Sequence, residues 1–278
     1  MREATRRLTD HLSALTDGYL VVVTGAGVSV ASGIATFRGS DPDAVWKRDI
    51  TELGTVRFFR QHPVASWRWY LDRFAQVTHA RPNPAHQALA ALERWHGARG
   101  GRFLLVTQNI DTLHRQAGSE RLIEVHGRAD RVRCAREGCR NGAPRGSLPR
   151  DAVAIEPFLD QPSGKTLPTC PACGELLRQH VLWFDEYYTS HQDYGWSSVE
   201  EAARDADLVL FVGTSFAVGV TAMFLQQGAR RQIPMLSIDP TSTPPPHAAV
   251  EALRAGAEHL LPDAVAVLTQ ATGSRRDA

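Results

Sequence analysis

The sequence lacks several features that would place a chain of this length in a familiar class. Its 278 residues contain no apolar run near the roughly 18 residues of a membrane-spanning helix, so no membrane partner is expected. Its net charge is only +1, which gives no electrostatic reason to expect nucleic acid as a partner. The basic N-terminus leads into an amphipathic segment rather than into the apolar core of a signal peptide. These absences favour a cytoplasmic location.

A glycine is also missing, from a loop that otherwise has the pattern of a phosphate-binding turn. Residues 20–23 form a β-branched run typical of a strand buried on both faces, and Gly25 and Gly27 follow it directly. These glycines would let backbone N–H groups approach an anion, and Ser29 can open a helix whose N-terminus favours one. A nucleotide is the first hypothesis, and a tight turn without a ligand is the alternative.

The dinucleotide fingerprint of dehydrogenases, G-x-G-x-x-G, is incomplete here. Val30 stands in the place of its third glycine, and the next glycine is Gly33. The polar stretch 37–49 offers no second strand that an acidic residue could end. A redox enzyme is therefore disfavoured, although a nucleotide is not.

Further along the chain, buried strands alternate with amphipathic helices, which predicts an α/β fold with a doubly wound, Rossmann-like parallel sheet. Polar clusters follow the strands and should meet at the carboxyl edge of the sheet. The further strands are expected at 103–106, 122–125, 208–212 and 233–238. Helices are expected at 3–16, 51–60, 63–77, from Pro84 after an Asn83 cap, up to Gln226, and near 247–256 and 262–270.

Two of these polar clusters carry side chains suited to chemistry. Gln108, Asn109 and Asp111 follow one strand and could hydrogen-bond a ribose or a carboxamide, although turn and capping roles are also open. His126 follows the next strand and precedes Gly127, which permits close approach. Histidine suits proton transfer near neutral pH, but a lone histidine is more often structural.

The four cysteines lie in two close pairs, Cys134/Cys139 and Cys170/Cys173. Such spacing in a reducing compartment indicates a structural zinc ion held by four thiolates rather than disulfides. The surrounding residues 128–178 are rich in Gly, Pro and Arg, so they are expected to form a small inserted zinc module. The nucleotide-binding domain would then comprise 1–127 and 179–272, with a helical part of the small domain near 36–80 and a disordered tail at 273–278.

Taken together, these motifs resemble the sirtuins, NAD-dependent protein lysine deacylases. The resemblance is collinear from about residue 20 to residue 270 and rests on G-A-G-V-S-x-x-S-G-I-x-T-F-R-G (25–39), T-Q-N-I-D-x-L-H (107–114), V-H-G (125–127), the cysteine pairs, V-L-W-F-x-E (181–186) and G-T-S (213–215). It implies attack of an acyl-lysine oxygen on the NAD ribose as nicotinamide leaves. The neutral imidazole of His126 would then act as the base towards a ribose hydroxyl that attacks the alkylimidate, and hydrolysis would release an O-acyl-ADP-ribose. Acylated-lysine proteins are the implied partners.

The resemblance also assigns site residues. His126 and Asn109 would be catalytic, and the zinc ligands would be the four cysteines. The implied NAD-binding residues are Gly25, Ala26, Gly27, Ser29, Phe37, Arg38, Gln108, Asn109, Ile110, Asp111, Gly213, Thr214, Ser215, Asp239 and Ala257. The implied substrate-binding residues are Tyr70, Arg73, Val181, Trp183 and Phe184.

Tyr70 and Arg73 are the residues expected to bind the acyl group. They match the Tyr-x-x-Arg pair that binds an acyl carboxylate in sirtuins acting on succinyl- and malonyl-lysine, and Thr36 agrees with that subgroup. Their i, i+3 spacing puts both on one helix face, where a phenol and a guanidinium suit a carboxylate. A chance pair on an aromatic helix, with the arginine bound to a nearby acid, is the alternative.

The chain departs from the family pattern at several positions. Asp185 replaces a usual glycine in the segment expected to pair with the substrate backbone, and its carboxylate would disfavour acidic peptides. Gln179 replaces a proline, Phe216-Ala-Val-Gly-Val220 replaces Leu-x-Val-x-Pro, and Ala35 replaces a frequent proline. An ADP-ribosyltransferase or NAD glycohydrolase, and a non-catalytic NAD-binding module, are the competing hypotheses.

Overall fold

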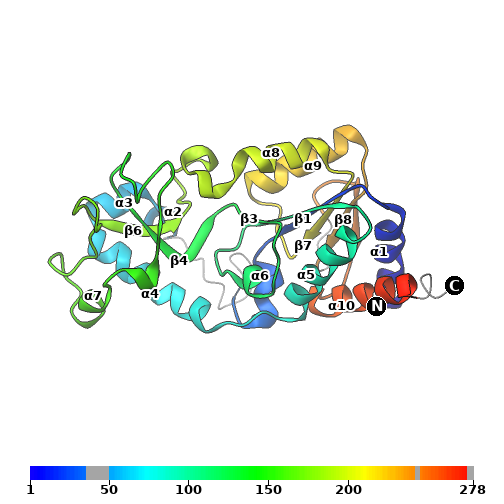
Figure 1. Ribbon diagram of the computed structural model, residues 1–278, viewed down its shortest axis with the longest axis horizontal. Helices are drawn as coiled ribbons and strands as arrows, with labels where there is room; N and C mark the ends of the chain where they lie inside the picture. The colour runs from blue at the N-terminus through cyan, green and yellow to red at the C-terminus, as the bar shows by residue number, and fades with distance from the viewer. Residues whose placement is uncertain (36–49, 242–244, 274–278) are drawn as a thin grey trace.

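The computed structural model describes residues 1–35, 50–241 and 245–273. In Figure 1 a large sheet with helices on both faces lies at one end of the elongated molecule, and a smaller unit lies at the other end. The predicted Phe37 and Arg38, together with Thr36, lie outside the described residues, as does the predicted tail beyond Gly273.

The large sheet has six strands in the order β3-β2-β1-β7-β8-β9, and all of its neighbouring strands are parallel. Val22 in the centre lies opposite Leu105 on one side and Leu210 on the other. This confirms the predicted doubly wound α/β fold. The strands are β1 (Tyr19–Thr24), β2 (Arg102–Thr107), β3 (Leu122–Glu124), β7 (Leu208–Val212), β8 (Met235–Ile238) and β9 (Val250–Leu253).

Every residue of β1 is buried, because both faces of the sheet are covered. Leu20 and Val22 point into one apolar cluster, while Val21 and Val23 point into the other, as alternation along a strand requires. The first cluster is completed by α1 (Arg2–Ala14), α5 (Pro84–Gly97) and α10 (Ala257–Gly273), and the second by α8 (Trp196–Asp205) and α9 (Gly219–Arg231) (Figure 1). A one-turn helix, α6 (Leu113–Gln116), follows the loop after β2.

The smaller unit is built on an antiparallel sheet with strand order β5-β4-β6. Its apolar cluster joins these strands to aromatic side chains of two helices, among them Phe59, Trp67 and Tyr70. The helix α4 is fixed to β6 by the indole of Trp67, which donates to the carbonyl of Leu177 at 2.9 Å. The elements are α2 (Ile50–Leu53), α3 (Val56–Gln61), α4 (Pro63–His79), β4 (Gly127–Cys134), β5 (Leu148–Pro149), α7 (Glu156–Asp160) and β6 (Leu177–Val181).

Short 3₁₀ turns complete the described elements at Ala26–Ser32, Arg150–Ala152, Tyr188–Ser190 and Gln192–Tyr194. The first of them stands where the sequence predicted the opening of an α-helix. The predicted cap of α5 is confirmed, since the Asn83 side chain accepts from the amide of Ala85 at 2.9 Å. None of the described helices is both long and apolar enough to cross a membrane.

The helix predicted near 247–256 is wrong, because the chain there forms β9. Residues 248–255 are rich in alanine, which favours helix, but pairing beside β8 outweighs that local preference. The predicted helix 51–60 is interrupted at Gly54 and Thr55, where the Thr55 hydroxyl accepts from the amide of Phe58 and starts α3. The predicted helix 262–270 is part of the longer α10.

Candidate active site

The strand order changes direction between β1 and β7, and the loops after these two strands are in contact. From β1 the chain proceeds outward to β2 and β3, whereas β8 and β9 lie on the far side of β7. The amide of Gly25 donates to the carbonyl of Val212 at 3.1 Å, and that of Gly27 to Gly213 at 2.9 Å. A crevice outside the carboxyl ends of the strands at such a switch point is where ligands bind in α/β sheets.

Packing between the two loops explains why they contain glycine. A Cβ atom on Gly27 would lie 2.7 Å from the Cα of Gly213, and a Cβ atom on Gly25 would lie 2.8 Å from the carbonyl oxygen of Gly213. Gly213 itself has φ of +56°, and a Cβ there would meet the Val28 amide nitrogen at 2.4 Å. The obstructing atoms are backbone, so no side chain can move aside. Approach of the loop amides to a phosphate stays a prediction.

The predicted ribose-binding group is a buried hydrogen-bond network beneath this loop. Asn109 donates from Nδ2 to the carbonyl of Gly25 and to Oγ of Ser29, both at 3.1 Å. Ser29 in turn donates to Oδ2 of Asp111 at 2.7 Å. Burial raises the pKa of Asp111, while hydrogen bonds from the Leu113 amide and Ser29 oppose the rise. These three predicted site residues therefore lie together, and their hydrogen bonds also stabilise the loop that follows β1.

Gln108 connects three strand ends. Its side-chain nitrogen donates to the carbonyl of Thr24 at 3.1 Å and to the hydroxyl of Thr214 at 3.2 Å. Ile110, two residues on, is half-buried against the apolar cluster of the smaller unit and accepts from the amide of Ala129 at 2.9 Å. The loop after β2 thus links the two units of the molecule.

His126 lies just beyond β3, and its hydrogen bonds define which nitrogen carries the proton. Nδ1 lies 2.7 Å from the carbonyl oxygen of Gln108, which can only accept, so Nδ1 is the protonated nitrogen. Burial lowers the pKa of His126 to about 4, despite that hydrogen bond. The imidazole is therefore neutral at pH 7, and Nε2 carries a lone pair able to accept a proton.

Tyr188 is a site residue that the sequence did not reveal. Its hydroxyl lies 3.3 Å from Nε2 of His126, and the two rings stack with an interplanar angle of 19°. Trp196 stacks on the other side of the tyrosine at 4.2 Å between ring centroids. Because Nε2 is unprotonated, the phenol donates this hydrogen bond. No local pattern marks Tyr188, since the contact joins residues 62 positions apart.

The remaining predicted NAD residues lie at the same edge of the sheet. Thr214 is buried and Ser215 is exposed, both directly after β7. Asp239 follows β8, where its amide donates to the carbonyl of Leu253 and its Oδ1 accepts from Thr241 at 2.8 Å. Ala257 is the first residue of α10. The structure brings these strand ends together as the sequence predicted, and their NAD contacts stay predictions.

The predicted substrate segment runs from the base towards α3. The amide of Leu182 donates to the carbonyl of His126 at 2.8 Å, and that of Phe184 donates to Gly54 at 3.0 Å. Val181 and Trp183 are buried in the apolar cluster of the smaller unit, whereas 53% of Phe184 is exposed. Phe184 is thus the surface member of the predicted substrate set.

Glu186, which ends this segment, lies between two buried arginines. Oε1 accepts from Arg133 at 2.5 Å and from Arg178 at 2.8 Å, and Oε2 accepts from the amide of Trp183 at 3.0 Å. Burial alone would raise the pKa of Glu186, but the two guanidiniums hold it below its usual value. The sequence motif contained the glutamate, but neither arginine was predicted.

Tyr70 and Arg73 both lie on α4. Tyr70 is 6% exposed and stacks on Trp183 with 5.9 Å between ring centroids. The Arg73 guanidinium lies over the ring of Trp69 at 4.5 Å. Burial raises the pKa of Tyr70 and lowers that of Arg73. Their role in binding an acyl carboxylate stays a prediction.

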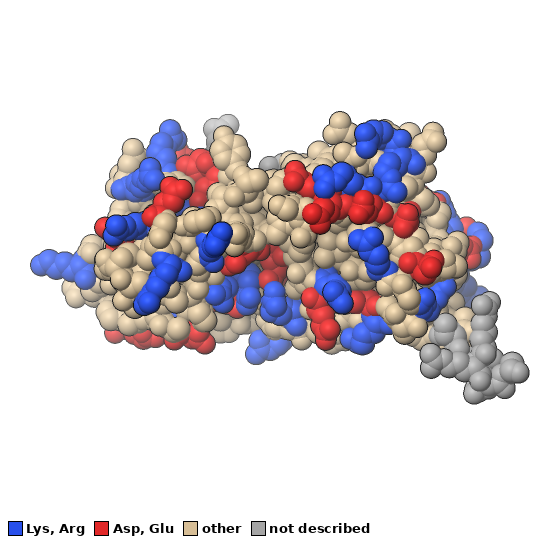
Figure 2. Space-filling view, turned by 45° about the horizontal axis from the view of Figure 1, so that its top comes forward, with Lys and Arg blue, Asp and Glu red and all other residues tan. Residues whose placement is uncertain are grey.

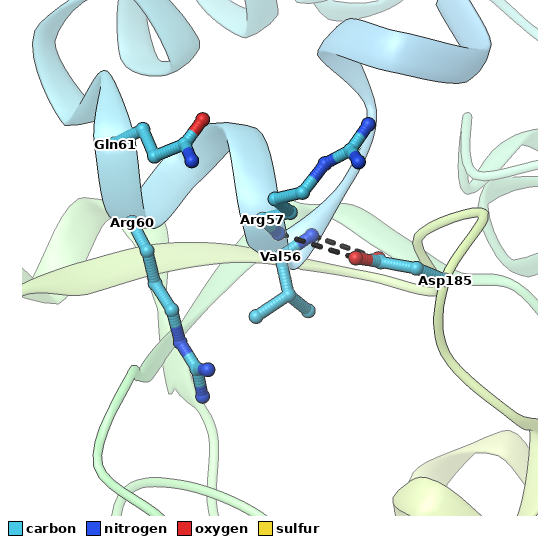
Figure 3. A pocket seen from close by; sticks show the side chains of 5 residues that line it. All are labelled: Val56, Arg57, Arg60, Gln61 and Asp185. Carbon is cyan, nitrogen blue, oxygen red and sulfur yellow. Dashed lines mark hydrogen bonds between the residues drawn. The ribbon is translucent and has the colours of Figure 1, made fainter.

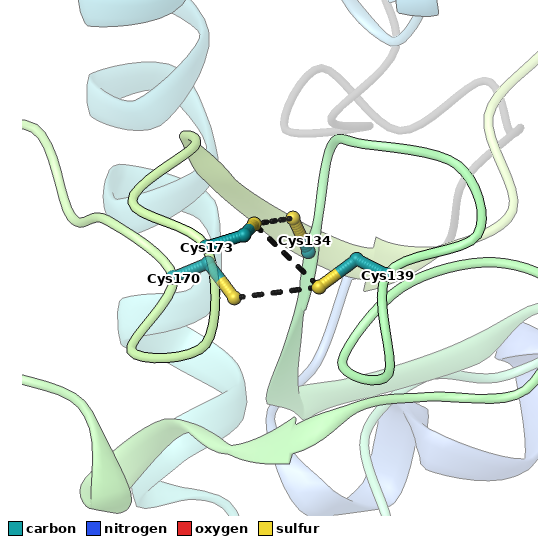
Figure 4. A group of neighbouring side chains, drawn as sticks. All are labelled: Cys134, Cys139, Cys170 and Cys173. Atoms are coloured by element: carbon teal, nitrogen blue, oxygen red, sulfur yellow. Dashed lines mark hydrogen bonds between the residues drawn. The ribbon is translucent and has the colours of Figure 1, made fainter.

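The four cysteines converge in the smaller unit, and all four are free thiols (Figure 4). Their sulfur atoms lie within 4.8 Å of one another, with Sγ–Sγ distances of 3.5 Å for Cys134–Cys173, 3.6 Å for Cys139–Cys173 and 3.8 Å for Cys139–Cys170. A tetrahedral zinc ion with Zn–S bonds of about 2.3 Å needs sulfurs roughly 3.8 Å apart. The cluster therefore fits a structural zinc ion.

Comparison with known proteins agrees with this geometry. Residues 25–220 match the sequence pattern of the Sir2 family. The chain belongs to the Sir2 family. It is 40% identical over 258 residues to an NAD-dependent protein deacylase of Thermus thermophilus, covering 92% of this chain and 91% of that one. It is 35% identical to the mitochondrial NAD-dependent protein deacylase sirtuin-5 of Danio rerio, covering 81% and 75%.

Solved structures of the Sir2 family also match. A Sir2 homologue crystallised with NAD superposes with a TM-score of 0.76 at 35% identity, covering 96% of this chain and 94% of that one. A complex of Sir2 with a p53 peptide and NAD gives a TM-score of 0.74 at 26% identity, covering 97% and 98%. The sheet and the small unit therefore share the fold of other Sir2 proteins along nearly their whole length.

This Sir2 family member contains a second cluster of possible metal ligands, formed by His180, His191 and Asp193. Most of the nitrogen and oxygen atoms that could bind a metal ion here already form hydrogen bonds within the protein. Nε2 of His180 pairs with Asp193 at 3.0 Å, and Nδ1 of His191 accepts from the Asp193 amide at 3.1 Å. Nε2 of His191 donates to the carbonyl of Gly146 at 3.1 Å. The cluster is better explained as a set of hydrogen bonds that holds the cysteine-bearing segment against the chain after β6.

Proposed function

We propose that this chain is an NAD-dependent protein lysine deacylase that transfers the acyl group of a modified lysine to ADP-ribose. The single observation that carries the proposal is His126, a neutral imidazole whose Nε2 lone pair lies at the carboxyl edge of the sheet. Its Sir2 relatives are named NAD-dependent protein deacylases. Acylated-lysine proteins or peptides would be the partners.

The described residues would divide the work between them. NAD supplies the ribose carbon that the acyl oxygen attacks and the nicotinamide that leaves. The Ser29–Asn109–Asp111 network would hold the ribose and carboxamide end, and the loops at Gly25 and Gly213 would face the pyrophosphate. His126 would accept the proton of a ribose hydroxyl at Nε2, while the Gln108 carbonyl keeps Nδ1 protonated and stabilises the imidazolium.

Zinc would have a structural role in this enzyme. Four thiolate ligands complete a tetrahedral site and leave no open position for water or substrate. The cysteines lie in the apolar cluster that also contains Trp67 and Phe158. The ion would therefore hold the smaller unit together, and His126 would carry the proton transfer.

We further infer a preference for acyl groups that end in a carboxylate, such as succinyl and malonyl. Tyr70 and Arg73 match the sequence pattern of that sirtuin class, and they share one face of α4. The 35% identity to a sirtuin-5 is consistent with this finer assignment. A guanidinium in a partly desolvated place binds a carboxylate strongly, which would favour succinyl- over acetyl-lysine.

A single NAD-dependent assay tests both the deacylase activity and the preference for acyl groups that end in a carboxylate. Acetyl-, succinyl- and malonyl-lysine peptides are incubated with wild type, His126→Ala, Arg73→Met and Arg68→Met, the last being an exposed arginine of the same helix. We expect His126→Ala to lose turnover on every peptide, and Arg73→Met to lose succinyl turnover while acetyl turnover is kept.

Equal loss on acetyl and succinyl peptides in Arg73→Met would contradict the carboxylate preference. The Arg68→Met control should match wild type throughout. If wild type attaches ADP-ribose to protein or hydrolyses NAD without deacylating any peptide, the chain is instead an ADP-ribosyltransferase or a glycohydrolase.

A further inference from the structure

The aspartate that replaces the usual glycine before Glu186 is occupied by backbone groups. Oδ1 of Asp185 accepts from the amide of Val56 at 2.8 Å, and Oδ2 accepts from that of Arg57 at 3.2 Å (Figure 3). These are the first two amides of α3, where a carboxylate is stabilised by otherwise unpaired N–H groups. The expectation that this carboxylate would disfavour acidic peptides is therefore weakened, since its charge is compensated within the protein.

The two arginines beside it have no counter-charge among the residues that the structure describes. A surface pocket of about 410 Å³ is lined by Asp185, Val56, Arg57, Arg60 and Gln61. Both arginines are exposed, and within the described part of the chain neither guanidinium has an ion-pair partner or a hydrogen-bond acceptor. Figure 3 shows the Arg60 guanidinium extending from one side of α3 and that of Arg57 from the other side. The pocket is thus a positively charged surface rather than a single fork for one anion.

Charges of both signs are mixed over the face of the molecule that Figure 2 shows, where lysine and arginine side chains are interspersed with aspartate and glutamate. The chain as a whole carries only +1. The two arginines can therefore attract an acidic group to this one place on the surface, although the net charge of the chain is close to zero.

The pocket is close to the candidate base along the chain. Leu182 is hydrogen-bonded to the backbone of His126, and Asp185 follows three residues later. Three residues span at most about 10 Å. Phe184 is in turn hydrogen-bonded to Gly54, which precedes α3 by two residues. A peptide whose modified lysine reaches His126 would thus bring its neighbouring residues within reach of Arg57 and Arg60.

We propose that Arg57 and Arg60 select acylated peptides that carry an aspartate or glutamate within a few residues of the modified lysine. The inference rests on the proposed deacylase function and adds a substrate class to it. Asp185 contributes indirectly, because it fixes the start of α3, and so the base of both arginines, against the segment that follows β6. The acidic peptide residue would take the place of the missing counter-charge.

The test uses one acyl-lysine peptide in three forms, with Glu, Gln or Lys at a flanking position, scanned from four residues before the modified lysine to four after. For wild type at low salt we expect kcat/KM to be about tenfold higher for Glu than for Lys at one or more positions, because Glu gains a surface ion pair with one of the arginines while Lys is repelled. Arg57→Gln/Arg60→Gln should reduce this ratio to about one, and Arg57→Glu/Arg60→Glu should invert it. Raising the salt to about 0.5 M should compress the wild-type ratio.

Two further variants control for nonspecific effects. Arg204→Glu/Arg230→Glu makes the same change in charge at exposed positions of α8 and α9 and should leave the ratio unchanged. Asp185→Asn should also keep the preference, because the carboxylate faces α3; a marked gain for acidic peptides would show instead that its charge faces the substrate. A wild-type ratio near one, or a ratio unaltered in Arg57→Gln/Arg60→Gln, would overturn the proposal. Failure of every peptide to react would refute the deacylase function itself.

Discussion

Replacing Glu186 by glutamine should destabilise the protein more than any surface charge change. The substitution keeps the size of the side chain but removes the acid that pairs with both Arg133 and Arg178. The side chains of these arginines are 3% and 5% exposed, and that of Glu186 is 11% exposed. Glu186→Gln would leave two guanidiniums buried without this counter-charge.

The magnitude follows from the cost of an uncompensated buried charge. Breaking a buried ion pair by removing one partner costs about 3–5 kcal/mol. Typical domains unfold with about 5–15 kcal/mol, so the variant should lose a large share of its stability. With roughly 2–4 °C of Tm per kcal/mol, the expected fall is on the order of 10 °C.

Urea unfolding followed by circular dichroism measures this loss, with the metal content of all variants kept equal. Glu3→Gln is the matched control, because Glu3 pairs with Arg6 on the exposed face of α1, where both side chains are more than 60% exposed. It should change the free energy of unfolding by less than about 1 kcal/mol. The double variant Glu186→Gln/Arg133→Met removes one unpaired cation and should recover part of the loss. A loss below about 1 kcal/mol in Glu186→Gln would refute the reasoning.

Burial lowers the pKa of His86 to about 4, below its value near 6.5 in the unfolded chain. The stabilisation that the neutral imidazole provides is therefore complete above pH 6.5 and is lost as the pH falls towards 4, by up to about 3 kcal/mol. His86→Gln should flatten this part of a curve of unfolding free energy against pH. Cys170→Ser should lower the zinc content of the purified protein and its Tm, whereas an unchanged metal content would contradict the four-thiolate site. Gln179→Leu should raise the free energy of unfolding by about 1 kcal/mol, because the buried Gln179 amide has no hydrogen-bond partner within the described residues, and a loss of stability would refute this.

The sequence was sufficient to predict the sheet and the meeting of its polar strand ends because both depend on local patterns. The apolar run at 20–23 marks the central strand, and His126 follows a strand that periodicity alone identifies. Within each pair the cysteines are so closely spaced that their convergence on one ion follows from the spacing itself. The strand β9 was missed because alanine-rich sequence favours helix until a neighbouring strand is present to pair with it.

Other features could not be predicted because they depend on contacts between distant segments. Tyr188 reaches His126 across 62 positions, and Asp185 caps a helix that starts 129 positions earlier. The sequence marks Asp185 as unusual, but the pattern alone placed its carboxylate in the substrate cleft. The structure directs it to α3, which weakens the expectation that this carboxylate disfavours acidic peptides.

The strand β4 would connect a metal ion bound by the cysteines with the candidate base. His126 immediately precedes its first residue, and the predicted zinc ligand Cys134 is its last. Its eight residues span at most about 26 Å, with an irregular register against β6 between Gly127 and Val132, so one strand joins the candidate base at one end to the candidate metal site at the other. Anchoring the far end limits how far the near end can pivot. An ion that never meets the substrate would thus still influence the angle at which the imidazole is presented.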